Sequence, residues 1–188
     1  DAGLAHLAGL LNLSDVRLYQ TSVTDEGLAV FTGMPDLAKL KLRGTVVRGP
    51  GLAHLAGLKN LTHLDLSETL VNDGGLMHLS AMNSLLDLNL GATQLSDAGL
   101  AHLSGLQNLA RLNVYENNTV TNAGLGHLGS ITSLESLNVG ATGINDEGLG
   151  QLAGLKKLKA LNVSFCPDVT GDGTGRLQEL IPGLLVEQ

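Results

Sequence analysis

Residues 61–76 read LTHLDLSETLVNDGGL, and residues 85–100 repeat the pattern as LLDLNLGATQLSDAGL. The same arrangement returns along the whole chain, with a Gly-Leu pair beginning at Gly3, Gly27, Gly51, Gly75, Gly99, Gly124 and Gly148. The steps between these glycines are 24, 24, 24, 24, 25 and 24 residues. A repeat of this length indicates one small structural unit stacked along an axis, which favours a long surface over a central pocket.

Each repeat carries a strand signal followed by a helix signal. Leu64 and Leu66 are two residues apart, so both side chains lie on one face of a strand. Asn72 and Asp73 then precede the Gly-Leu pair and are suited to capping the start of a short helix. We therefore predict the order strand, turn, short helix, turn, with the strands of successive repeats side by side and parallel.

Glycine and proline mark the predicted helix ends. A helix in most repeats is expected to close on a left-handed glycine. This glycine stands at Gly9, Gly33, Gly57, Gly105 and Gly154. In the tail, Pro182-Gly183 stops a last helix, and a short strand is expected near Leu185.

Composition narrows the function classes. Of 188 residues, 43% are apolar, which argues against disorder. Eleven basic and eighteen acidic residues give a net charge of −7, which argues against a general nucleic-acid binder. A membrane-spanning helix needs a run of about 18 apolar residues, and no apolar run in this sequence approaches that length. We therefore expect no membrane insertion. Cys166 is the one cysteine, so an internal disulfide is excluded.

The quoted segments, together with LESLNVGATGINDEGL at 134–149, resemble leucine-rich repeats, whose signature is LxxLxLxxNxL. The resemblance covers essentially the whole chain and is closest to bacterial proteins of the cysteine-containing and GALA-like subclasses. The usual Asn position is occupied by Thr21, Thr45, Thr69, Thr93, Asn117, Thr142 and Cys166. In the family this Asn bonds the turn backbone, and a Thr hydroxyl can do part of that.

The resemblance implies an α/β fold, a curved right-handed solenoid with a parallel β-sheet on its concave face and short helices on its convex face. It also implies a partner-binding role, usually for protein. We expect a single domain over residues 1–188 with about seven repeats of 24–25 residues and a C-terminal cap at about 174–188. Because Asp1 already lies within a repeat, we expect a truncated N-terminus.

Alternate residues of each strand face solvent and supply the candidate site. Lys39, Lys41 and Arg43 alternate on one strand beside Arg17, and exposed aromatics and arginines are typical interface anchors. The predicted partner-binding residues of the concave face are Arg17, Tyr19, Lys39, Lys41, Arg43, His63, Asp65, Asn89, Arg111, Asn113, Tyr115, Asn138, Asn162 and Phe165.

Two structural interpretations compete with binding. Asp15 and Asp65 on the flanking strands could neutralise the cations. The asparagines could bond one another along the sheet, or they could bond a peptide backbone or a sugar.

Catalytic and metal chemistry find little support. The spacing of His63 and Ser67 along one strand puts them about 13 Å apart, too far for a triad with Asp65. A column of histidines could serve as a metal site or as a pH switch. Side chains in a row do not converge on one point, however, as the tetrahedral coordination of a metal ion requires. This column contains His6, His54, His78, His102 and His127. No catalytic, cofactor or metal residues are therefore predicted.

The sequence thus predicts a non-enzymatic, monomeric protein–protein interaction module that binds a protein through its concave face and needs no cofactor. Two alternatives stay open. The chain could be the substrate-recognition region of a larger enzyme, such as a bacterial effector ubiquitin ligase, or a cell-surface scaffold that binds carbohydrate. The compartment is open, and secreted, periplasmic and cell-surface locations in a bacterium are all compatible with the sequence.

Overall fold

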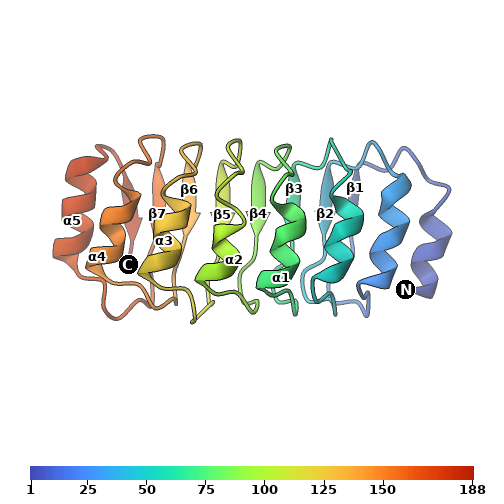
Figure 1. The fold of residues 1–188 in the computed structure, drawn as a ribbon, viewed down its shortest axis with the longest axis horizontal. Coiled ribbons are helices and arrows are strands. Elements are labelled where there is room, and N and C mark those ends of the chain that lie inside the picture. The colour runs from blue at the N-terminus through green and yellow to red at the C-terminus, as the bar shows by residue number, and fades with distance from the viewer.

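The computed structural model describes residues 1–188 as a row of stacked repeats, with a sheet on one side and short helices on the other (Figure 1). Eight parallel strands lie in chain order within one sheet. They are β1 (Asp15–Arg17), β2 (Lys39–Lys41), β3 (His63–Asp65), β4 (Asp87–Asn89), β5 (Arg111–Asn113), β6 (Ser136–Asn138), β7 (Ala160–Asn162) and β8 (Leu185–Glu187). The predicted parallel stacking is confirmed, including the last strand at Leu185.

The register does not slip anywhere along the sheet. The central residue of each strand pairs with the central residue of the next, from Val16 opposite Leu40 to Leu161 opposite Val186. Backbone hydrogen bonds continue past the strands, since Gln20 N–H donates to the Arg43 carbonyl at 2.9 Å. Each unit therefore lies above its neighbour with its side chains in the same positions.

The helical layer changes character along the chain. The first three units contain only 3-10 turns, η1 (Ala2–Leu7), η2 (Glu26–Gly33) and η3 (Pro50–Leu55). The later units begin with α-helix, in α1 (Asp73–Leu76), α2 (Asp97–Ala101), α3 (Asn122–Leu128), α4 (Asp146–Leu149) and α5 (Gly171–Leu180), and two of these continue as 3-10 turns, η4 (Met77–Leu79) and η5 (Gly150–Leu152). No helix combines the length and the apolar character that crossing a bilayer requires.

Capping distinguishes the two kinds of unit. The N-cap residue of each helix from α1 to α5 accepts a backbone hydrogen bond through its side chain, as Asn72 does from the Gly75 N–H. The turns η1, η2 and η3 have no such bond. A side-chain cap satisfies backbone donors that a short helix otherwise leaves unpaired, which favours the α-helical start.

The expected left-handed glycines at the helix ends are wrong. Gly9, Gly33, Gly57, Gly105 and Gly154 have no positive φ. Positive φ occurs instead in the turn after each strand, at Gln20, Gly44, Glu68, Ala92, Glu116, Ala141 and Phe165. The reason is that this residue must reverse the chain out of the sheet while its N–H still bonds the next strand, as the Ala92 N–H bonds the Tyr115 carbonyl at 2.7 Å.

One continuous apolar core of 48 buried residues fills the space between sheet and helices. Beneath the turns, threonine hydroxyls take the place of the usual asparagine. Thr45 and Thr142 donate to the carbonyls three residues earlier at 2.7 and 2.6 Å. Asn117 does more, because it donates to Leu90 O at 2.9 Å and accepts from Leu95 N–H at 3.1 Å, which joins two units. The buried Cys166 thiol occupies the same column.

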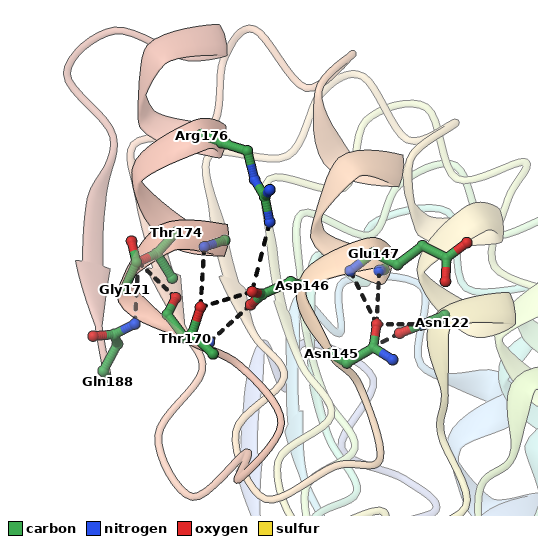
Figure 2. A network of polar contacts seen from close by, with 11 residues as sticks. Asn122, Asn145, Asp146, Glu147, Thr170, Gly171, Thr174, Arg176 and Gln188 are labelled. Atoms are coloured by element: carbon green, nitrogen blue, oxygen red, sulfur yellow. Dashed lines mark hydrogen bonds and ion pairs between the residues drawn. The ribbon is translucent and has the colours of Figure 1, made fainter.

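A ladder of aspartates connects the helix starts of successive units. Asp146 accepts hydrogen bonds from the Thr170 N–H at 2.8 Å and the Thr170 hydroxyl at 2.7 Å, and Arg176 lies 3.6 Å away (Figure 2). Asp97 receives the same pair of bonds from Thr121 at 2.8 and 2.7 Å. Each carboxylate thus joins the first turn of one unit to the cap of the next.

The ladder is interrupted at Gly49, which stands where other units have this acid or, at Asn122, the amide that replaces it. Gly49 has a φ of 137°, and a Cβ atom there would lie 2.7 Å from the Gly75 Cα. The units of η3 and α1 therefore meet through bare backbone. This close approach of two backbones requires glycine.

Gly49→Ala is expected to destabilise the chain by about 1–3 kcal/mol, because the new methyl group meets the Gly75 backbone and the backbone conformation disfavours side chains. The matched control is Gly57→Ala, whose Cβ would meet nothing within 4 Å. This control is expected to be neutral or to stabilise by up to about 1 kcal/mol. Urea unfolding of both variants checks the pair, and equal effects would contradict the assigned backbone conformations.

Asp146→Asn is expected to reduce the acid sensitivity of folding. The backbone N–H and hydroxyl of Thr170, with the charge of Arg176, hold the pKa of Asp146 below its usual value of 3.8. A lowered folded-state pKa contributes stability that is present above pH 3.8 and is lost as the pH falls through the lowered value. Urea midpoints at pH 7, 5 and 3 should therefore fall less steeply in the variant than in the wild type. Asp172→Asn, at an exposed carboxylate of the next helix, α5, should keep the wild-type slope.

Candidate functional site

The alternation of the strands builds the candidate site. The central residue is buried in β1 to β7 and partly buried in β8, so its two neighbours project from the sheet face opposite the helices, which we call the concave face. The in-register pairing lines these neighbours up in two columns. The leading column contains Asp15, Lys39, His63, Asp87, Arg111, Ser136, Ala160 and Leu185, and the central column contains Arg17, Lys41, Asp65, Asn89, Asn113, Asn138, Asn162 and Glu187.

Two residues further along each strand lies a third column, which carries the aromatic residues. It contains Tyr19, Arg43, Ser67, Gly91, Tyr115, Gly140 and Ser164, with Phe165 directly after it. All fourteen residues predicted for the site therefore lie on the concave face or at its rim. The structure places them as one strip across β1 to β7.

The cations at the N-terminal end of the strip differ in their pairing. Arg17 pairs with Asp15 of its own strand at 2.8 Å, and Arg43 pairs with Glu68 at 2.6 Å. Lys39 and Lys41 form no ion pair, whereas each of the three arginines in these columns forms one. The predicted neutralisation by Asp15 and Asp65 is therefore partial.

The carboxylates beside the lysines have other partners. Asp65 accepts hydrogen bonds from the Ser67 N–H at 3.1 Å and the Ser67 hydroxyl at 2.7 Å. The hydrogen bond from Arg17, together with the charges of Arg17, Lys39 and Lys41, holds the pKa of Asp15 below its usual range. Two cationic side chains without an ion pair, Lys39 and Lys41, therefore lie on β2 in a chain whose net charge is −7.

The asparagines of the central column do not bond one another along β4 to β7, which corrects that alternative. Each Oδ1 accepts a hydrogen bond from the backbone N–H two residues later, at 3.1 Å for Asn89, 2.9 Å for Asn113 and 3.0 Å for Asn138. Asn162 does the same at 2.9 Å and also donates to Glu187 at 2.6 Å. Asp65 occupies the same position and uses its carboxylate in the same way.

An aromatic pair lies at the rim of the C-terminal half. The rings of Tyr115 and Phe165 meet edge to face with centroids 6.4 Å apart and planes inclined by 77°. The Tyr115 ring covers Gly140 of the intervening unit, where a Cβ would lie 3.0 Å from its Cδ2. Phe165 is 77% exposed, although its contact with Tyr115 fixes its position.

The concave face is hollowed at both ends. A depression of about 520 Å³ adjoins Tyr19, Gln20, Lys41, Arg43 and Asp65, and one of about 390 Å³ crosses β6 to β8. Between them the Arg111–Asp87 ion pair, at 2.8 Å, crosses β4 and β5. Leu185, which is 73% exposed on the floor of the second depression, was missed as a site residue although its strand was expected. Extending the repeat register into the tail would have found it.

The hydrogen bonds of the concave face do not form a catalytic triad. The Thr62 hydroxyl lies 2.8 Å from His63 Nδ1 but also donates to the Ala38 carbonyl at 3.1 Å, and the Asp65 carboxylate accepts from Ser67 and not from His63. The histidine column lies on the helical side, where His78 is half-buried and the other four are exposed. No three histidine, cysteine or acidic side chains converge as a metal site would need. The geometry favours contact with a partner over bond-making chemistry.

Comparisons with known proteins agree with the repeat. A family model described as a leucine-rich repeat matches residues 130–153. A sequence comparison with curated proteins finds no match. The chain is similar to the crystal structure of internalin C2 from Listeria monocytogenes, with a TM-score of 0.74 and 27% identity over 97% of this chain and 72% of that one. It is also similar in fold to the internalin InlF of the same species, with a TM-score of 0.70 and 19% identity over 97% of this chain and 56% of that one. The chain therefore has the fold of a leucine-rich-repeat solenoid, similar to that of the Listeria internalins.

Proposed function

We propose that residues 1–188 act as one non-enzymatic binding domain that recognises a protein partner through the concave face. The observation that carries this proposal is the pair of unpaired lysines, Lys39 and Lys41, which face the same way from β2. The leucine-rich-repeat fold supports a role in protein interaction, because stacked units present a long surface without a closed pocket.

The partner is expected to present an acidic surface at β2. Complementary charge raises the association rate and fixes the orientation of a complex more than it raises affinity alone. Tyr19 and Arg43 line the depression at the N-terminal end of the concave face together with Lys41, so an aromatic ring and a guanidinium can pack against a partner's side chains there. Charged and apolar contacts would therefore combine at this end.

The aromatic pair supplies a second anchor on the same face. Tyr115 and Phe165 offer exposed apolar area in a fixed arrangement, which limits the entropy lost on binding. A larger enzyme that used this domain to select its substrate would bind through the same two anchors. An independent binding domain and the substrate-recognition region of an enzyme would therefore both require the same residues of the concave face.

Lys39→Glu/Lys41→Glu is expected to weaken binding at least tenfold, because it reverses the unpaired positive charge that an acidic partner would meet. The probes are twelve-residue peptides selected on the wild-type chain from a phage-displayed random library. Their dissociation constants are measured by fluorescence anisotropy at about 0.15 M and about 0.5 M NaCl. The affinity of the wild type should fall at the higher salt concentration, where charges are screened.

The matched control is Lys59→Glu/Lys157→Glu, which makes the same change in net charge at two exposed lysines outside the three columns and without ion pairs. Its affinity should stay within about twofold of the wild type. Selected peptides without enrichment in Asp or Glu, or equal loss in both double variants, would refute the assignment of the binding surface.

A further inference from the structure

The central column presents three hydrogen-bond donors that the chain itself does not use. In Asn89, Asn113 and Asn138 the Oδ1 atom is occupied by the backbone N–H two residues later. None of their Nδ2 groups donates to another protein atom, whereas the Nδ2 of Asn162 is taken by Glu187. The three amides are half-buried on adjacent strands, β4, β5 and β6.

The backbone contact fixes which end of each amide is free. Because the oxygen is held by an N–H, the NH₂ group is the end left for a ligand, and the row is a row of donors. Adjacent strands are about 4.8 Å apart, so the outer two donors are separated by about 10 Å. That distance matches about three residues of extended peptide, in which the two carbonyl oxygens that face one side are about 7 Å apart. Because each carbonyl oxygen has two lone pairs, these two acceptors can serve all three donors.

The alternative ligand class is a sugar. A hydroxyl group both donates and accepts, so it pairs best where donors and acceptors lie side by side. Along this row the amide oxygens already hold a backbone N–H. The nearby carboxylates are occupied as well, Asp65 by Ser67 and Asp87 by Arg111, and beyond β3 the lysines Lys39 and Lys41 are donors. The chemistry of the strip therefore favours carbonyl and carboxylate oxygens.

We propose that the partner contributes an extended peptide segment that crosses the strands from β2 to β6. An acidic side chain lies over Lys39 and Lys41, and main-chain carbonyls accept hydrogen bonds from the Nδ2 groups of Asn89, Asn113 and Asn138. This proposal rests on the proposed function and adds the form of the ligand. From β2 to β6 are four strand spacings, about 19 Å, which about six extended residues span.

The mode of recognition follows from the two kinds of contact. The amide row binds main chain and accepts many sequences, whereas the lysines require an acid at one end. Binding peptides should therefore share an acidic residue near one end and vary in the next several positions.

The deciding variant is Asn113→Asp/Asn138→Asp. Asp65 shows that a carboxylate in this column keeps the bond to the N–H two residues later, so the variant is expected to fold with the wild-type urea midpoint. It replaces two free donors with acceptors. The matched control is Ser136→Asp/Ala160→Asp, which adds the same charge in the leading column of β6 and β7 and leaves the amides intact.

The probes are the selected twelve-residue peptides, measured by fluorescence anisotropy at about 0.5 M NaCl so that added repulsion is screened. We expect the amide variant to bind at least tenfold more weakly than the wild type and the control to change less than threefold. If Lys39→Glu/Lys41→Glu weakens binding but the amide variant matches its control, the peptide mode is wrong and the proposed function stands. If neither lysine nor amide variant weakens binding, or the selection yields no peptide while a glycan array gives binding that the amide variant abolishes, both are wrong.

Discussion

The in-register stacking of one buried aliphatic residue per strand is the constraint on which the rest of the structure depends. A single unit cannot bury its apolar side chains alone, because only the neighbouring units cover them. Val16, Leu40 and their counterparts meet at the same height in every strand. Since strand side chains alternate with a period of two, a slip of one residue would exchange the core with the concave face. The register therefore defines the candidate binding surface as well as the core.

Polar side chains strengthen this stacking from its two edges. Thr45 and Asn117 satisfy carbonyls under the turns on one side of the core, and aspartates such as Asp97 connect helix starts on the other. The bond of Thr45 lies within its own unit, whereas those of Asn117 and Asp97 join residues 22 to 27 positions apart and add to the neighbour contacts that hold a solenoid together.

Much of the fold could be predicted from the sequence because it follows from periodicity. Spacing alone placed Leu64 in a strand, Leu66 on the same buried side, Asn72 at a helix start and Lys41 on the concave face. The conformation of individual turns could not be predicted, since Glu68 and Ala92 have positive φ although neither is glycine. That conformation arises from hydrogen bonds to the next unit. Likewise, the pairing of Arg43 with Glu68 and the free amide of Asn113 depend on three-dimensional neighbours that spacing does not reveal.

The missing acid at Gly49 divides the array into two blocks. Within each block a side chain joins successive helix starts, an aspartate in most units and Asn122 between α3 and α4. Isolated β-bridges beside the helix starts begin only at Asn72. Between the blocks the helix starts meet through the contact of two glycines, while Arg43 and Glu68 still join the turns of the two units. The lysines belong to the first block and the free amides to the second. A ligand that bound both would therefore bridge the two blocks and would oppose local unfolding of the units whose helical turns lack a side-chain cap.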